Sequence, residues 1–262
     1  MYQNRELEVE IGLLKEKFHA AAAAQEEFLN LAAHDLNAPL RKLSSFTDLL
    51  INQIPGTQDP KIIKYQQKIH HCVNQMRDMI DRLALLAEVA FLSPPIVDCD
   101  LNKIVLQVSG EVSPLHPESG ITVVAGSLPI IEGNYKQFRQ LFLELITNSF
   151  SYSKKNSASS IRIDAQVLPQ EELLLLPGNF LKQLYYKIVV SDSGIGIPGD
   201  AIKKLFSPFH RGHGPSGTDG YGLGLAICKK IVNNHHGIIY ATSNEKITEL
   251  IMILAEKQTY PC

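Results

Sequence analysis

The chain has 262 residues, of which 45% are hydrophobic and 20% are charged, and its formal net charge at pH 7 is -2. This length fits one large or two ordinary domains with an ample core, and the weak net charge argues against nucleic acid as the main partner. The four cysteines show neither a zinc-ligand spacing nor a disulfide framework. Without a hydrophobic run of membrane-spanning length or a signal-peptide pattern, we expect a cytoplasmic chain, either whole or the cytoplasmic part of a longer protein.

Residues 1–27 carry hydrophobic or small side chains in alternating steps of four and three. This spacing is the heptad repeat of a coiled coil, although a single amphipathic helix lying on its own domain is an alternative. We favour a parallel coiled-coil lead-in that continues into the next helix. The expected assembly is therefore a homodimer.

The next helical segment, Phe28 to Leu50, contains the sequence HDLNAPLR, which begins at His34. Its hydrophobic residues keep a helical spacing, and a proline inside a helix costs about 3 kcal/mol, so a helix that bends near Pro39 is expected. His34 then lies beside the hydrophobic stripe, open to a partner. Taken alone, such a histidine is more often an ordinary surface or core residue.

A turn is expected at residues 51–60, and hydrophobic positions from Ile62 to Ala90 again step by four and three. Two amphipathic helices joined by a short loop form a hairpin, and two hairpins bury their seams as a four-helix bundle. His70 and His71 are adjacent and so do not share a helix face, which favours solvent-facing residues over metal ligands. Pro94-Pro95 ends the helix and marks the domain boundary.

The remaining chain mixes strands and helices, which predicts an α/β sandwich with helices on one face of a mixed sheet. The overall fold class is therefore α + α/β. Residues 170–183 are expected to form an extended hairpin connection whose leucines cover the core. The helices are expected at 101–112, 135–153, 200–205 and 223–235, and the strands at 121–124, 129–131, 160–168, 185–191, 238–243 and 248–255.

Glu144 and Asn148 are four residues apart on the predicted helix 135–153, and therefore lie one above the other on one face. A carboxylate and an amide oxygen in this arrangement suit a hard divalent cation such as Mg²⁺. Without support from other motifs, two ordinary surface residues would be the better interpretation.

A second motif begins at Asp192, which directly follows a hydrophobic strand and precedes Gly194 and Gly196. The glycines remove side-chain bulk and permit a positive φ, so a flat ligand can approach the backbone while the carboxylate accepts a hydrogen bond from it. A plain turn is the alternative.

The third motif has glycines at positions 220, 222 and 224 and runs into a helix. Glycines at a helix entrance expose backbone N–H groups to an anion, and the helix dipole adds to the attraction. This is neither a Walker loop, which needs a following Gly-Lys-Ser/Thr, nor a dinucleotide fingerprint, which follows a strand.

Together with the His34 segment, these motifs resemble the conserved boxes of sensor histidine kinases, including an F box at Phe206 to Phe209. The resemblance extends from about Gln25 to Ala255. It implies a dimerisation and histidine phosphotransfer domain at 28–93, and an ATP-binding domain of the gyrase and histidine-kinase superfamily at 97–258.

The resemblance also implies the site. Asn148 would ligate Mg²⁺, Asp192 would read the adenine amino group, and Tyr152 would pack near the adenine. Residues 210–219 would form a lid over the phosphates, with Arg211 facing the γ-phosphate. The nucleotide-binding residues implied are Glu144, Asn148, Tyr152, Asp192, Gly194, Gly196, Arg211, Gly220, Gly222 and Gly224.

The implied mechanism is attack of a neutral His34 ring nitrogen on the γ-phosphorus of MgATP, while Asp35 orients the imidazole and takes its proton. His34 would be reached from the same or the opposite subunit, according to the handedness of the turn at 51–60. The phosphoryl group would then pass to an aspartate of a response-regulator receiver domain. ATP and Mg²⁺ are thus the expected cofactors.

Two departures from the family pattern keep other functions open. Many members have Asn at the position of Glu144, whose carboxylate matches the general base of superfamily members that hydrolyse ATP. Many also have Lys at the position where this chain has Ser151. The serine lacks the phosphate contact that the lysine would make. A superfamily ATPase and a catalytically silent dimeric scaffold are therefore the alternatives.

Ala38 yields a first prediction. Family members that also dephosphorylate their regulator usually have Thr or Asn four residues after the histidine, where a polar group can hold the attacking water. Alanine has no such group, so we expect weak or absent phosphatase activity, and its appearance in Ala38→Thr. Rapid dephosphorylation of a purified phospho-regulator in the presence of ADP, unaffected by changes at residue 38, would refute this.

Overall fold

The computed structural model describes residue 33 and residues 36–50, 60–91, 95–152, 160–177, 180, 183–210, 221–244 and 247–258. The chain divides into two compact units, Met1–Leu92 and Ser93–Cys262. The predicted coiled-coil lead-in at 1–27 lies outside the described residues, as do positions 51–59 of the predicted turn.

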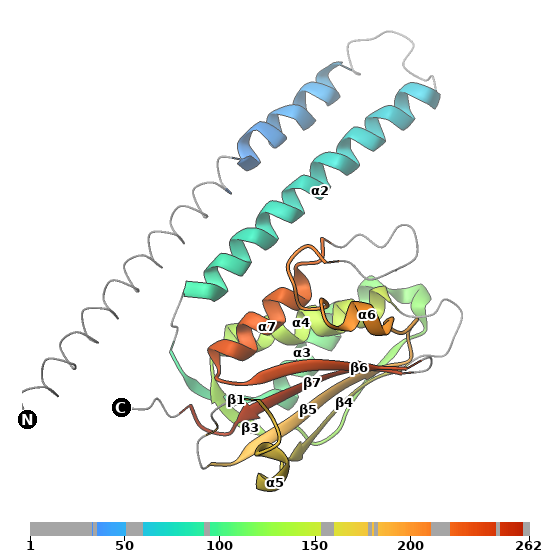
Figure 1. The fold of residues 1–262 in the computed structure, drawn as a ribbon. Helices are drawn as coiled ribbons and strands as arrows, with labels where there is room; N and C mark the ends of the chain where they lie inside the picture. The colour runs from blue at the N-terminus through green and yellow to red at the C-terminus, as the bar shows by residue number, and fades with distance from the viewer. Residues whose placement is uncertain are drawn as a thin grey trace, which may run out of the picture. The chain divides into compact units, whose positions relative to one another are not determined.

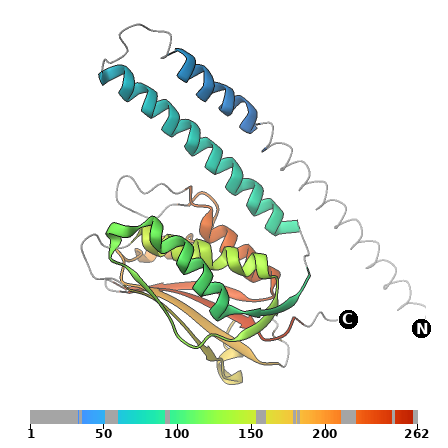
Figure 2. The ribbon, with the colours of Figure 1, turned by 180° about the vertical axis from the view of Figure 1, so that it is seen from behind.

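The first unit contains two helices that lie side by side in both views (Figures 1 and 2), one over residues 36–50 and α2 over Pro60–Phe91. Pro60 begins α2, a position where its missing N–H leaves no helical hydrogen bond unmade. Asn37 Nδ2 donates to Asp81 Oδ1 at 3.0 Å and joins the two helices. The helical hairpin expected from the sequence is thus confirmed.

The hydrophobic seam of α2 divides between two faces. Val73 is fully buried and Ala87 is 5% exposed, as expected for residues that pack inside the hairpin. Ile69 and Met76 of the same seam are 40% and 43% exposed. One hairpin therefore buries one face of α2 and leaves hydrophobic side chains on another.

His70 corrects one expectation. Its Nε2 lies 2.9 Å from Asp48 Oδ1 on the other helix, and its Nδ1 lies 3.5 Å from the Ser44 hydroxyl. The adjacent His71 is exposed. The prediction of a solvent-facing side chain thus fails for His70, which joins the two helices, because the spacing of adjacent residues does not show which of them meets the neighbouring helix.

The second unit is built on a five-stranded mixed sheet in the order β2-β4-β5-β7-β6. Its strands are β2 (Thr122–Ala125), β4 (Ser160–Val167), β5 (Tyr185–Asp192), β7 (Thr248–Ala255) and β6 (Ile238–Ser243). β2 and β4 are parallel, and the other neighbours are antiparallel. A separate antiparallel ribbon pairs β1 (Val97–Asp100) with β3 (Ile130–Gly133).

Three longer helices cover one face of this sheet (Figures 1 and 2). They are α3 (Leu101–Val112), α4 (Tyr135–Ser151) and α7 (Gly224–Asn234). The shorter elements are η1 (Ser113–Leu115), η2 (Pro117–Ser119), α5 (Gln170–Leu173) and α6 (Gly199–Ile202). The α/β sandwich predicted from the sequence is confirmed, whereas the strand β1 was not predicted.

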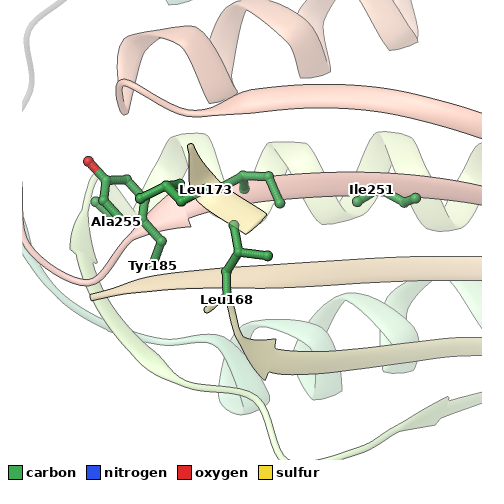
Figure 3. Packing of buried hydrophobic residues seen from close by; sticks show 6 residues of the cluster. Leu168, Leu173, Tyr185, Ile251 and Ala255 are labelled. Carbon is green, nitrogen blue, oxygen red and sulfur yellow. The ribbon is translucent and has the colours of Figure 1, made fainter. Parts of the chain in front are cut away.

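β7 forms the centre of the core because both of its faces are buried. Leu250, Met252 and Leu254 alternate along β7 with the residues that point to the opposite face. On that opposite face a cluster packs beneath the segment that contains α5 (Figure 3), made up of Leu168, Leu173, Tyr185, Ile251, Ile253 and Ala255.

The expected hairpin connection is confirmed, since β4 and β5 are antiparallel neighbours, but it contains one turn of helix over residues 170–173 that was not predicted. Its leucines also differ from one another. Leu173 is 5% exposed in the cluster, whereas Leu174 and Leu175 are 80% and 85% exposed. One turn of helix directs one leucine to the sheet and the next two to solvent.

This difference gives a second prediction. Leu173→Ala should lower the free energy of unfolding by about 2 to 5 kcal/mol, because it removes a buried side chain and leaves a cavity. Leu175→Ala, from the same segment, should change it by less than about 0.5 kcal/mol. Urea unfolding followed by circular dichroism measures both, and equal losses would contradict the packing of α5 on the sheet.

Candidate functional site

The Asp192 carboxylate lies at the end of β5 and is held by two donors. The Gly194 N–H donates to its Oδ1 at 2.9 Å, and the Ser149 hydroxyl of α4 donates to its Oδ2 at 3.3 Å. Burial raises the pKa of Asp192 above its ordinary value, and the two hydrogen bonds oppose that rise. The carboxylate is therefore a partly buried acceptor, fixed in orientation at the end of the central strand β5.

Gly194 is required by the close approach of α4 to the loop after β5. A Cβ at this position would lie 2.6 Å from the Tyr152 carbonyl oxygen and 2.7 Å from Asp192 Oδ1. The same carbonyl accepts a hydrogen bond from the Ile195 N–H at 3.1 Å. The loop is thus closed onto the end of α4, and any side chain at residue 194 would push the two apart.

Gly196 secures the other side of this loop. Its φ is +78°, in the left-handed region that favours glycine, and a Cβ would lie 3.0 Å from the Asn244 carbonyl oxygen. The Ile197 N–H donates to the Ser243 hydroxyl of β6 at 2.9 Å. The loop therefore bridges α4 and the end of β6.

α4 presents Glu144 and Asn148 one turn apart, as the spacing predicted. Glu144 is 8% exposed and accepts a hydrogen bond from Gln140 Nε2 at 2.8 Å. The Asn148 carboxamide is half-buried and makes no hydrogen bond within the described ranges. An amide oxygen and a carboxylate so placed match the ligands of Mg²⁺, so these residues fit a magnesium ion that keeps water and phosphate in its shell.

α7 begins at Gly224, the last glycine of the third motif. Gly222 has a φ of +69°, and a Cβ there would lie 2.5 Å from the His210 carbonyl oxygen. Within the residues that the structure describes, the N-cap position Leu223 provides no side-chain hydrogen bond to the N-terminus of α7. Its first N–H groups, together with the helix dipole, are therefore available to an anion.

The three motifs converge because α4 and α7 run antiparallel. His235 at the end of α7 contacts Asn134 at the start of α4. Cys228, seven residues earlier in the sequence than His235, contacts Leu141, which is seven residues later than Asn134. The same register brings Gly224 about level with the stretch of α4 that carries Glu144. The N-terminal end of α7, whose N–H groups suit an anion, thus lies near the part of α4 that suits magnesium.

Four predicted site residues, namely His34, Asp35, Arg211 and Gly220, lie outside the described residues. Ala38 lies in the described helix of the first unit and is half-buried. Sequence reasoning missed Ser149 and Ser243, whose hydroxyls hold the loop after β5. Ser149 lies between the motif residues Asn148 and Tyr152, and Ser243 belongs to no motif, so only the pairing of distant segments reveals their hydrogen bonds.

The comparisons with known families agree with this arrangement. The "Histidine kinase-, DNA gyrase B-, and HSP90-like ATPase" family matches residues 133–258. The "His Kinase A (phospho-acceptor) domain" matches residues 24–89. A phosphoacceptor domain followed by an ATPase domain defines a protein-histidine kinase. The chain belongs to the sensor histidine kinases and contains their catalytic core.

Relatives from several bacteria support the assignment. The phytochrome-like protein Cph1 of Synechocystis sp. is 27% identical over 90% of this chain and 29% of its own length. Cyanobacterial phytochrome B of Nostoc sp. is 30% identical over 83% of this chain and 27% of its own length. The sensor histidine kinase AtsR of Burkholderia thailandensis is 27% identical over 80% of this chain and 33% of its own length. The chain thus spans about a third or less of these relatives.

Solved structures show the same fold. Full-length ShkA in complex with AMPPNP has a TM-score of 0.63 at 19% identity, covering 88% of this chain and 46% of that one. The histidine kinase AdeS of Acinetobacter baumannii has a TM-score of 0.56 at 18% identity, and the match covers 85% of this chain and 98% of that one. In the part of the chain that the structure describes, no helix has the length and hydrophobicity needed to cross a bilayer.

Asp192 gives a third prediction. Its raised pKa means that the charged form costs folding stability, a cost absent below the unfolded-state pKa of about 3.8 and complete once the pH exceeds the folded-state pKa. Asp192→Asn keeps an acceptor for the Gly194 N–H and removes the charge. We therefore expect the ligand-free variant to melt at a higher temperature than wild type at pH 7, with the difference shrinking as the pH falls toward 3.8.

The exposed carboxylate of Asp164 on β4 provides the control, because Asp164→Asn should leave the melting temperature nearly unchanged. ATP should raise the melting temperature of wild type and of this control, but should barely affect Asp192→Asn. A strong ATP-dependent rise in Asp192→Asn would remove Asp192 from the nucleotide site.

Proposed function

We propose that this chain transfers the γ-phosphoryl group of MgATP to His34, and from there to an aspartate of a response-regulator receiver domain. The observation that carries the proposal is the fixed, partly buried Asp192 carboxylate in a chain that also carries the HDLNAPLR segment. The first suits an adenine amino group, and the second provides a phosphoacceptor. We retain 1–27 as a coiled-coil lead-in, and 28–93 and 97–258 as the two domains.

In the nucleotide site, Asp192 accepts a hydrogen bond from the adenine amino group, and Tyr152 packs near the base. The phosphates meet the N-terminal N–H groups of α7, and Arg211 contacts the γ-phosphate. The uncapped start of α7 and the glycines around it support this placement. The structure of ShkA with AMPPNP supports a nucleotide as a ligand of this fold.

Asn148 would hold the magnesium ion, with the Glu144 carboxylate one turn before it. When bound, the ion neutralises negative charge on the phosphates. The half-buried Asn148 carboxamide supports this role because it makes no hydrogen bond within the described residues and is thus available to a ligand. Glu144 is held by Gln140, which keeps its carboxylate on the same helix face.

In the transfer step, a nitrogen of the neutral His34 imidazole forms a bond to the γ-phosphorus, and the bond between that phosphorus and the β,γ-bridging oxygen breaks. ADP leaves with the electron pair of that bond. Asp35 orients the ring through its other N–H and takes that proton. The protein contributes mainly position and charge, as phosphoryl transfer generally requires.

A homodimer accounts for the hydrophobic side chains that one hairpin leaves exposed. On the helix over 36–50, Leu36, Leu43 and Leu50 recur every seven residues and are 54%, 46% and 65% exposed. Ile69 and Met76 on α2 repeat at the same interval and are also exposed. A second hairpin would bury both stripes in a four-helix bundle, which supports the dimer.

The fourth prediction tests the activity. With γ-labelled MgATP the protein should take up acid-labile, base-stable label, which is the signature of phosphohistidine. His34→Gln should lose the label and keep nucleotide affinity near wild type, because His34 lies in the other domain. His71→Gln, an exposed histidine on α2, should label normally.

Several results would contradict the proposal. Undiminished label in His34→Gln would move the phosphoacceptor elsewhere. Release of phosphate with no label on the protein would indicate the superfamily ATPase. Dimerisation with neither label nor phosphate release would indicate the silent scaffold.

A further inference from the structure

We propose that His235 is a positioning residue for the nucleotide site, in which one imidazole ring locks the register between α4 and α7. The proposal rests on the function above, because it concerns the helices that hold the nucleotide. His235 lies at the opposite end of these helices from the ligand. It is 1% exposed, and its ring nitrogens bond to main-chain groups of both helices.

The two hydrogen bonds determine the protonation state of the ring. Nε2 accepts from the Asn134 N–H at 2.9 Å, and Nδ1 lies 2.8 Å from the Ile231 carbonyl oxygen. A main-chain N–H can only donate and a carbonyl can only accept, so Nδ1 carries the proton and Nε2 is bare. His235 is therefore neutral and connects the two helices only in that form.

Packing holds the ring in this position. The Phe138 ring of α4 stacks on it with a centroid distance of 4.2 Å and an interplanar angle of 28°. Gly133 leaves the space for both rings, because a Cβ there would lie 2.9 Å from His235 Cδ2 and would clash with Phe138. Three separate segments thus shape the position of one imidazole.

The contact joins the start of α4 to the end of α7. Asn134 is the N-cap of α4, and its side chain accepts from the Gln137 N–H at 2.9 Å while its own N–H reaches His235. Asn234 Nδ2 adds a bond to Gln137 Oε1 at 3.3 Å. A sliding of one helix past the other would break this group of contacts and, at the far ends, separate Asn148 from the start of α7.

Acid should break the hydrogen bond between His235 and Asn134. A second proton on the ring would turn Nε2 into a donor that faces the Asn134 N–H. Burial lowers the pKa of His235, the hydrogen bond to the Ile231 carbonyl opposes this, and the charge of His236, in the turn after α7, lowers it further. From α4 and β3 the ring meets Phe138, the Asn134 main chain and Gly133, none of which titrates. Nucleotide affinity should therefore fall only once the pH is well below the ordinary histidine pKa of 6.5.

Two substitutions at residue 235 distinguish an effect on the register of the two helices from an effect on stability. In His235→Gln, Oε1 replaces Nε2 as the acceptor for α4, and the side chain does not titrate. In His235→Asn, the shorter side chain reaches only its own helix. Both lose the stacking on Phe138, so both should lower the melting temperature of the whole chain by similar amounts. His236→Asn is the control, because asparagine tolerates the positive φ of 52° at that exposed position.

The affinity for MgADP, measured by titration calorimetry from pH 5.5 to 8, tests the proposal. At pH 7.5, His235→Asn should bind about fivefold more weakly than wild type, the order expected for one lost hydrogen bond, and His235→Gln should remain within about twofold. As the pH falls toward 5.5, wild type should bind more weakly, and His236→Asn should begin to weaken at a slightly higher pH because it lacks the charge that lowers the pKa of His235. The affinity of His235→Gln should follow only the titration of the ligand.

Equal affinities in wild type and both His235 variants, with only the melting temperature changed, would overturn the proposal and leave His235 a structural residue. Equal weakening of the Gln and Asn variants, or an unchanged pH profile in His235→Gln, would also overturn it. Failure of wild type to bind MgADP at any pH would instead refute the proposed function, on which the role of His235 depends.

Discussion

The Asp192 carboxylate is the group on which the proposed nucleotide site depends. It is partly buried, so its charge is costly unless donors surround it. Ser149 and Gly194 supply two donors, and a ligand N–H would supply another. The backbone approach at Gly194 fixes where those donors lie. Stability of the ligand-free domain and affinity for the ligand are therefore opposed at this residue, as is common where a charged group is held ready for a partner.

The rest of the second unit holds this carboxylate, α4 and the start of α7 in fixed relation. β5 ends at Asp192 and pairs with β4 and β7, both of which lie inside the sheet. α4 and α7 pack on one face and are joined at their distant ends through His235. The binding groups thus stand on rigid elements, and the segments between them can vary without moving the site.

Much of this arrangement could be predicted from the sequence because it follows from periodicity. α3, β6 and β7 have the predicted limits, and each has a clear hydrophobic pattern. β1 was missed because it has only four residues with mixed polarity, and α5 because a single turn is too short to show a helical period. His70, Ser149 and His235 take their roles from partners far away in sequence, and such pairings leave no local pattern.

The most direct test is a crystal structure of the protein with Mg²⁺ and a non-hydrolysable ATP analogue. The adenine amino group should lie within hydrogen-bonding distance of the Asp192 carboxylate, Asn148 should contact the metal, and phosphate oxygens should meet the N-terminal N–H groups of α7. An adenine ring bound away from Asp192, or phosphates that do not contact the start of α7, would contradict the proposed site.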